Sequence, residues 1–284
     1  MTRFVSLNQF VNTWECDEND HMNVQFYFAK FDDAATVFAA VHSLEDALGR
    51  RVSRHVRYHR ELRGAAPLRV LSSLVHPIQA KSLWAPGTLV QHVMVETTTG
   101  AIAATALDYH EGVATADQED ILDQLEPLVT PRGIVETPQI IEPPRAAERV
   151  VFRSVLHPDL CRADGTARDQ AYIAAMSDAA SHTWDEIGID CNWLSEHGFG
   201  RIAVEMRLSL HKPMMAGCLY QLQISYRDLT SRAFGKRLDF FDVRDQTHYG
   251  HVDSTVMLLN HATRRSEPLP GFAREAITAR LAKE

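Results

Sequence analysis

The feature that most constrains the fold of this 284-residue chain is an internal repeat. Shifting the sequence by 145 residues aligns CDENDHMNVQFYFAKFDDAAT (16–36) with CRADGTARDQAYIAAMSDAAS (161–181). Seven of the 21 aligned positions are identical, where roughly one or two would be expected by chance, and an offset near half the chain is typical of a duplicated domain. The sequence therefore predicts two related halves.

Both copies of the repeat have the apolar spacing of a helix that is buried along one side. In the first half the apolar positions are Val24, Tyr27, Phe28, Phe31, Ala34, Ala35, Phe38 and Val41, and in the second they are Tyr172, Met176, Ala179, Ala180 and Trp184. We expect Asn23 and Asp169 to cap these helices, because short polar side chains accept hydrogen bonds from the first N–H groups of a helix.

Segments with strand character follow each helix. They cover 54–62, 68–78, 88–98 and 101–110 in the first half, and 201–211, 218–228, 236–245 and 251–261 in the second. A short strand is also expected before each helix, at about 8–15 and 149–156. The pattern predicts an α+β fold in which each half combines one long helix with an antiparallel meander.

These patterns divide the chain into four parts. A first repeat (1–115) and a second repeat (148–267) are joined by a linker at 116–147, which contains five of the twelve prolines. The linker is expected to hold one short helix near 118–126. The remainder, 268–284, is expected to be a tail with a turn and a short exposed helix.

Composition excludes several functional classes. The net charge is −8 and the sequence pI is about 5.9, without a cluster of Lys and Arg interleaved with aromatics, so we expect no binding to nucleic acid. The sequence has no run of about 18 apolar residues, so no membrane span is predicted. The start lacks a signal-peptide pattern, and we therefore expect a cytoplasmic protein. The four cysteines have no CxxC spacing, so neither a disulfide framework nor a zinc ribbon is indicated.

A cluster of polar residues directly precedes the first helix: Asp17, Asn19, His21 and Asn23. It has three interpretations: a helix cap, a metal site or an active site. At the equivalent positions the second half has Arg162, Asp164, Thr166 and Arg168, so the set is lost where the helix pattern persists. A purely structural motif would be expected in both copies, and the difference therefore favours an active site.

A metal site built from Asp17, His21 and Glu61 is conceivable by residue type, but no ligand spacing supports it. We predict neither a metal nor a cofactor. Five further histidines are interpreted as surface or core residues of strands: His55, His59, His110, His248 and His251.

The motif Asp-x-Asn-x-His-Met-Asn, which begins at Asp17 and enters a helix in a duplicated α+β chain, resembles the hotdog-fold acyl-CoA and acyl-carrier-protein thioesterases. Those enzymes form the 4-hydroxybenzoyl-CoA thioesterase-like superfamily. The resemblance implies a tandem double hotdog, in which each repeat wraps an antiparallel sheet around one long helix. It implies Asp17 as the catalytic carboxylate, with Asn19, His21 and Glu61 as further catalytic residues. Asp20 departs from the pattern, because a glycine often precedes the histidine in the family.

The chemistry of thioester hydrolysis fits these residue types. A helix N-terminus offers backbone N–H groups and partial positive charge, so a carbonyl docked near residues 22–26 would be polarised without a metal. Asp17 would deprotonate water or attack the carbonyl directly, and the sequence leaves both routes open. Asn19 and His21 would hold the water or the thioester oxygen, and Glu61 would position or assist the base.

Four further residues are candidates for substrate binding. Asn23 and Tyr27 lie at the start of the first helix, near the expected thioester. Arg162 and Arg168 in the second half are candidates because guanidinium groups bind phosphates well, and coenzyme A carries phosphates. The alternative is that both are ordinary solvated arginines.

The expected partner is an acyl-CoA or acyl-carrier-protein substrate held between the halves, and association into a homodimer is left open. Two other functions are weighed. An enoyl-CoA hydratase of the same fold is disfavoured, since those enzymes resemble Asp-x-Asn-Pro-x-His and no proline follows Asn19. A non-catalytic acyl-CoA sensor would need an output domain, and none is indicated.

Overall fold

The computed structural model describes residues 4–17, 19–76, 87–113, 122–123, 133–134 and 149–281. The chain divides into two compact units, Met1–Gln139 and Ile140–Glu284, called here the first and the second unit. The predicted linker at 116–147 and its helix near 118–126 lie almost entirely outside the described residues.

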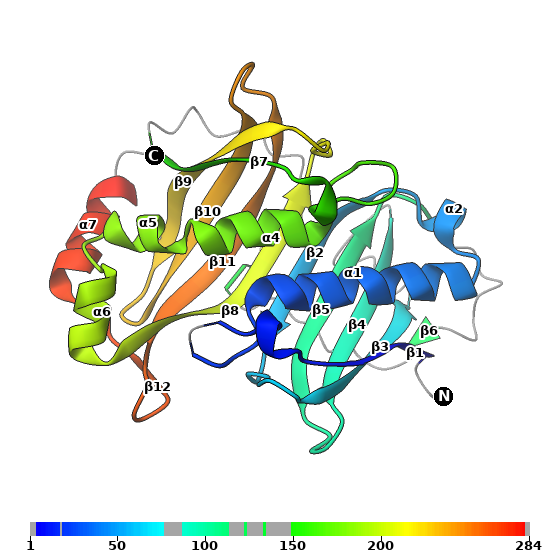
Figure 1. Ribbon diagram of the computed structural model, residues 1–284, viewed down its shortest axis with the longest axis horizontal. Helices are drawn as coiled ribbons and strands as arrows, with labels where there is room; N and C mark the ends of the chain where they lie inside the picture. Colours follow the sequence, from blue (N-terminus) through cyan, green and yellow to red (C-terminus); the bar gives the residue numbers. More distant parts are fainter. Residues whose placement is uncertain are drawn as a thin grey trace. The chain divides into compact units, whose positions relative to one another are not determined.

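The first unit combines one long helix with a five-stranded antiparallel arrangement (Figure 1). Its elements are β1 (Phe4–Phe10), the 3-10 helix η1 (Thr13–Glu15), α1 (Val24–Val41), α2 (Glu45–Leu48), β2 (Arg51–Tyr58), β3 (Pro67–Val75), β4 (Thr88–Glu96), β5 (Ile102–His110) and β6 (Leu122–Asp123). Neighbouring strands follow the order β1-β3-β4-β5-β2, and β6 pairs with β3 in parallel. Helix α1 lies across one face of these strands.

Helix α1 is the helix that the apolar spacing predicts. Tyr27, Phe28, Phe31 and Phe38 are at most 3% exposed and face the sheet, and burying each aromatic side chain stabilises the fold by about 1.5–3 kcal/mol. The helix begins where predicted, because the Asn23 side chain accepts a hydrogen bond from the Gln25 N–H at 3.1 Å.

Two boundaries in the first unit differ from prediction. The strand expected over 54–62 ends at Tyr58, so Glu61 lies in the connection after β2 and not on the strand. The strand expected at about 8–15 is β1 followed by η1, because the chain turns at Asn12, whose N–H donates to Glu15 Oε2 at 2.8 Å. Both differences concern segments that lead into the polar loop.

The second unit repeats the topology of the first. Its elements are β7 (Val150–Val155), η3 (Pro158–Leu160), α4 (Asp169–Asp178), α5 (Ala180–Asp185), α6 (Cys191–His197), β8 (Phe199–Leu210), β9 (Leu219–Leu229), β10 (Ala233–Asp242), β11 (His248–Asn260), β12 (Arg265–Glu267) and α7 (Gly271–Leu281). The strand order β7-β9-β10-β11-β8 is that of the first unit when both are counted from their first strand. The α+β fold is thus present in each unit.

The second unit departs from prediction at its helices. The single long helix expected there is divided at Ala179, whose N–H approaches the carbonyls of both Ala175 and Ser177 and so tightens the turn. Asp169 is not the cap, because Arg168 occupies that position without a capping side-chain bond, and Asp169 is the fully buried first residue of α4.

The C-terminal segment is integrated into the second unit. It forms α7, which packs on β9 and is therefore more than the exposed tail that was expected. Its side chains Ala273 and Ile277 are completely buried.

The difference between the two caps yields a paired prediction. Asn23→Ala is expected to lower the free energy of unfolding by about 1 kcal/mol, and Arg168→Asn is expected to raise it by a similar amount, because each change removes or supplies a cap acceptor. Thermal unfolding followed by circular dichroism measures both changes. Equal shifts for the two variants in the same direction would contradict the assignment of the caps.

A cluster of buried charges lies between α1 and the sheet of the first unit. The Arg54 guanidinium donates two hydrogen bonds, of 2.7 and 2.6 Å, to the Asp108 carboxylate, and both side chains are completely buried. Asp32 from α1 approaches Arg54 at 3.8 Å, and His92 Nε2 lies 3.4 Å from Asp108. Burial alone would raise the pKa of the Asp108 carboxyl, but the charges of Arg54 and Arg51 hold it well below its ordinary value.

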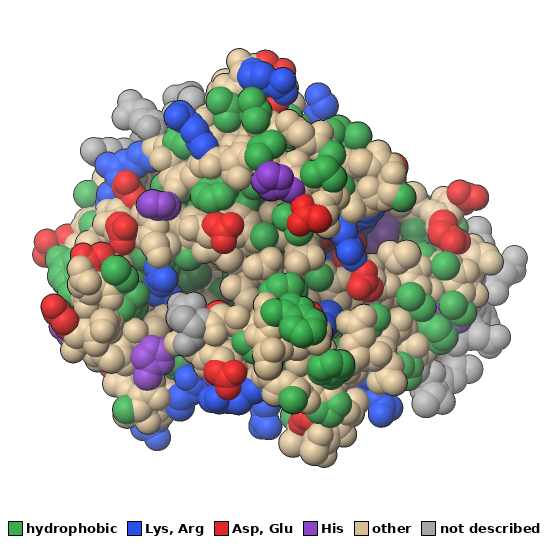
Figure 2. All heavy atoms as spheres, viewed as in Figure 1, with side chains coloured by type: hydrophobic (Ala, Val, Ile, Leu, Met, Phe, Trp, Pro, Cys, Tyr) green, Lys and Arg blue, Asp and Glu red, His purple; other side chains and the backbone are tan. Residues whose placement is uncertain are grey.

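Over most of the face shown in Figure 2, acidic and basic side chains are interspersed, and several basic side chains gather along its lower edge. Among the described residues, none of the helices has the length and apolar character needed to cross a membrane.

Candidate active site

Four of the predicted site residues lie in or beside one compact loop before α1. Cys16 and Met22 pair as an antiparallel bridge, and the Asp17 N–H donates to the His21 carbonyl at 2.8 Å. The partly exposed Asp17 carboxylate accepts hydrogen bonds through Oδ1 from the N–H groups of Asn19 (2.9 Å) and His21 (3.2 Å). Asp17 therefore stabilises the loop with one oxygen.

The structure brings His21 and Glu61 together, although forty residues separate them in the sequence. His21 Nε2 lies 3.3 Å from Glu61 Oε2, with the His21 side chain 9% exposed and that of Glu61 38% exposed. The pairing arises because His21 forms a bridge with Arg63, which places the connection after β2 alongside the loop. The structure thus places His21 and Glu61 in contact, in the loop that also contains Asp17 and beside it.

Tyr27 binds the connection that follows β2. Its hydroxyl accepts a hydrogen bond from the Leu62 N–H at 3.2 Å, and the Met22 N–H donates to the Leu62 carbonyl at 2.7 Å. Burial raises the pKa of Tyr27, which keeps the hydroxyl protonated. These contacts give Tyr27 a structural role, and its part in substrate binding stays a prediction.

The second unit contains the same hydrogen-bonded frame. In the first unit, the four bonds of the frame run from Asp17 N–H to His21 O (2.8 Å), Asp20 N–H to Asp17 O (3.1 Å), Met22 N–H to Leu62 O (2.7 Å) and Leu62 N–H to the Tyr27 hydroxyl (3.2 Å). In the second unit, the corresponding bonds, in the same order, run from Arg162 N–H to Thr166 O (2.8 Å), Gly165 N–H to Arg162 O (2.9 Å), Ala167 N–H to Met214 O (2.9 Å) and Met214 N–H to the Tyr172 hydroxyl (3.1 Å). Because Leu62 corresponds to Met214, Glu61 corresponds to Pro213.

The two frames carry different side chains. Where the first unit has Asp17, His21 and Glu61, the second has Arg162, Thr166 and Pro213. The shared main-chain bonds show that the frame does not require the acid and base side chains. Their presence in one copy therefore points to chemistry.

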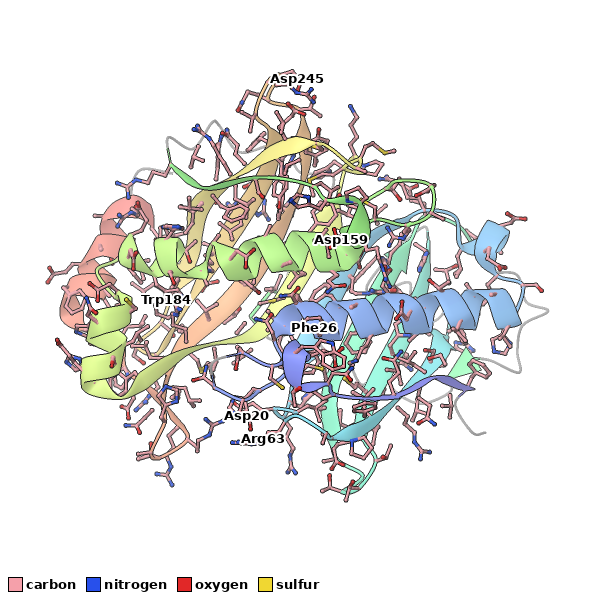
Figure 3. The ribbon with its side chains drawn as sticks, in the orientation of Figure 1. Asp20, Phe26, Arg63, Asp159, Trp184 and Asp245 are labelled. Atoms are coloured by element: carbon pink, nitrogen blue, oxygen red, sulfur yellow. The ribbon has the colours of Figure 1, made fainter. Side chains whose placement is uncertain are left out.

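A left-handed backbone explains the unusual residue at position 20. Asp20 has φ 59°, and its counterpart Gly165 has φ 81°. Glycine adopts this conformation without strain, and aspartate is among the few other residues that tolerate it. The Asp20 carboxylate also lies 3.4 Å from Arg63 Nη1, and Figure 3 shows the two side chains next to each other, with Phe26 on the first turn of α1.

The N–H groups at the start of α1 are mostly occupied. Met22 donates to Leu62, Asn23 to the Glu15 carbonyl, and both Gln25 and Phe26 to Asn23. Among the described residues, the Val24 N–H has no acceptor. Of the amides at residues 22–26 that were predicted to polarise a substrate carbonyl, Val24 is therefore the candidate.

One element of the site was missed in the sequence. Lys30 on α1 is 3% exposed and its Nζ lies 2.9 Å from Glu15 Oε1, which fixes η1 against the helix. The spacing from Asn12 to Glu15 matches a capping box and was the available signal. Burial and the nearby acids Asp20 and Asp17 raise the pKa of Cys16, so that its thiol is a poor nucleophile.

The two arginines of the second unit contact their own loop. Arg162 Nη1 donates to the Ala167 carbonyl, and Nη2 lies 3.7 Å from Asp169 Oδ1 at the start of α4. Arg168 stands at the N-cap of α4. A role for either in binding phosphate stays a prediction.

Comparison with known proteins supports the thioesterase class that the loop residues suggest. Residues 11–141 match the model of the thioesterase-like superfamily, a range that contains the loop and α1. No curated protein sequence matches the chain. The match covers slightly less than half of the chain and shows that its first unit is similar to this superfamily.

Solved structures show the same fold at low sequence identity. The chain is similar to an acyl-ACP thioesterase from Bacteroides thetaiotaomicron (TM-score 0.57, 9% identity, 89% of this chain and 96% of that one). It is also similar to the 12:0-ACP thioesterase from Umbellularia californica (0.60, 8%, 92% and 93%). A third is a Lactobacillus plantarum protein assigned provisionally as an oleoyl thioesterase (0.63, 9%, 88% and 94%).

Proposed function

We propose that the protein hydrolyses an acyl thioester, with acyl-CoA as the first candidate substrate, and that its two units form a tandem double hotdog. The observation that carries the proposal is the repeated frame, in which the first unit alone has Asp17, His21 and Glu61. The match of residues 11–141 to the thioesterase-like superfamily model and the similarity to acyl-ACP thioesterase structures support the reaction class.

The proposed mechanism uses the loop and the start of α1. The thioester carbonyl would lie at the Val24 N–H, where one hydrogen bond and the helix dipole stabilise the negative charge that develops on oxygen. Asp17 Oδ1 is occupied by two loop amides, so Oδ2 would face the reacting water or the carbonyl carbon. As a general base, Asp17 would take a proton from water while the water oxygen bonds to the carbonyl carbon. The C–S bond then breaks, the thiolate takes up a proton, and Asp17 returns its proton to solvent.

His21 and Glu61 would act together in this scheme. Glu61 fixes the His21 ring through their 3.3 Å contact, and the ring would hold the water or the leaving sulfur. Asn19 lies in the same loop and is proposed to help orient the water, and Asn23 holds the helix start in place. Arg162 and Arg168 remain candidates for coenzyme A phosphates.

A thiol-release assay over a panel of acyl-CoA esters, from short polar to long aliphatic and aromatic acyl groups, tests the function. We expect release of coenzyme A from at least one class of ester. Loss of enoyl absorbance from crotonyl-CoA without thiol release would instead identify a hydratase. Tight acyl-CoA binding with neither reaction would identify a binding protein.

The His21–Glu61 pair yields a separate prediction. Glu61→Gln is expected to lower kcat by about tenfold to a hundredfold, which is less than the loss of a proton-transferring group, because Glu61 is proposed to position His21. Steady-state kinetics measure the effect. Arg60→Gln, an exposed neighbour in the same connection, serves as the control and should retain wild-type kcat.

A further inference from the structure

Three histidines of the second unit form a cluster that the proposed function does not use. His211 follows β8, and His248 and His251 lie on β11. One possible ligand atom from each residue lies within 4.8 Å of the others. The ring centroid of His211 lies 4.8 Å from that of His248 and 5.5 Å from that of His251, and the latter two are 6.3 Å apart, so the three rings form a triangle.

A bulge in β11 creates this grouping. His248 and His251 are three residues apart and would point to opposite faces of a regular strand. The register shifts between Phe240 and Phe241, which leaves Tyr249 as an extra residue and turns both histidines to one side. Gly250 permits the bulge, because a Cβ there would lie 2.3 Å from the Ser209 carbonyl oxygen. The Tyr249 carbonyl then accepts from the His211 N–H at 2.9 Å and holds the third ring in place.

A carboxylate orients one of the rings, and a second carboxylate lies near another. His248 Nε2 lies 2.9 Å from Asp239 Oδ1, and His251 Nε2 lies 3.5 Å from Asp253 Oδ2. A ring that donates its Nε2 proton to a carboxylate has Nδ1 as an acceptor, and this arrangement of carboxylate and histidine is the usual support of metal-binding imidazoles. Asp253 is also bound by Arg237 at 2.6 Å, so Asp239 is the carboxylate whose charge is available to the cluster.

We propose that His211, His248 and His251 bind a divalent transition metal ion, with zinc as the ion that three imidazoles favour. Nitrogens on one tetrahedral zinc are about 3.4 Å apart, given zinc–nitrogen bonds of about 2.05 Å. The cluster therefore needs a closure of up to roughly 1.5 Å, which rotation of the partly exposed His211 side chain would provide while Asp239 holds His248 in place.

The three histidines come from two segments of the second unit, the residue that follows β8 and the strand β11. The bound ion would join the end of β8 to β11 and stabilise the second unit.

The test is zinc binding to tag-free full-length protein that has been stripped with a chelator. Titration calorimetry with zinc chloride is expected to show one equivalent per chain, and a higher melting temperature with zinc than without it. His248→Gln and His211→Gln should each weaken binding at least tenfold. The control His182→Ala removes an exposed histidine of the same unit and should leave binding unchanged.

Folding of the variants is checked separately by melting in chelator, where wild type and both glutamine variants should agree. The proposal is overturned if the wild-type protein binds no zinc. It is also overturned if the two glutamine variants bind zinc as well as wild type does, since the ligands would then lie elsewhere.

Discussion

Asp17→Asn is expected to lower kcat/KM for acyl-CoA hydrolysis by about a hundredfold to ten-thousandfold, the range that a positioned proton-transfer group contributes. Asparagine keeps the side-chain oxygen that accepts from Asn19 and His21, so the loop should retain its shape. The charge and the basicity are lost while the geometry stays. Thiol release measured at several substrate concentrations gives kcat and KM separately.

Asp20→Asn is the matched control for this experiment. Asp20 is an exposed acid of the same loop, and asparagine tolerates its left-handed backbone as aspartate does. We expect kcat within about twofold of wild type for this variant, because Asp20 is placed outside the chemistry. A fully active Asp17→Asn enzyme would refute the role of Asp17, and equal losses in both variants would show that the loop charge alone matters.

Arg54→Met is expected to have the largest effect on stability, lowering the free energy of unfolding of the first unit by about 3–5 kcal/mol. The reason is that Asp108 would stay completely buried after losing its two-bond partner. Urea unfolding followed by circular dichroism measures the change. Arg69→Met, an exposed arginine on β3, is the control and should shift stability by less than about 0.5 kcal/mol.

The same variant has a defined dependence on pH. Because the folded pKa of Asp108 lies well below its ordinary value of about 3.9, its contribution is complete above that value and is lost as the pH falls further. In the variant, burial raises the pKa of Asp108, so the stability difference between wild type and Arg54→Met should be largest near neutral pH and should narrow on acidification, starting above about pH 4. A difference that grows on acidification would show that another group carries the effect. The double variant Arg54→Met, Asp108→Leu should recover part of the loss, since no buried charge is then left without its partner.

The sequence predicts the regular parts of this fold well. The apolar period of α1 and its Asn23 cap are local signals, and the structure confirms both. The strands are found near their predicted positions because alternation and turn residues are local as well. The break at Ala179 and the buried Asp169 were not predictable, since both depend on how α4 packs against its own unit.

The candidate site, too, could be predicted only where its residues are close together in the sequence. Asp17, Asn19 and His21 could be grouped because they are close in sequence. Glu61 was placed on a strand, and its contact with His21 depends on the connection after β2. His211, His248 and His251 were interpreted singly or not at all, because a strand bulge and a distant turn bring them together, and neither leaves a spacing motif.

The loop before each helix is held by main-chain bonds and a tyrosine, so its shape tolerates almost any side chain at the positions matching 17, 21 and 61. After a gene duplication, such a loop could lose its reactive groups by neutral drift without unfolding the domain that carries it. Selection for folding then acts on the main chain of the loop, and selection for turnover acts on its side chains. That separation accounts for one copy that keeps an acid and an imidazole beside another that keeps their scaffold.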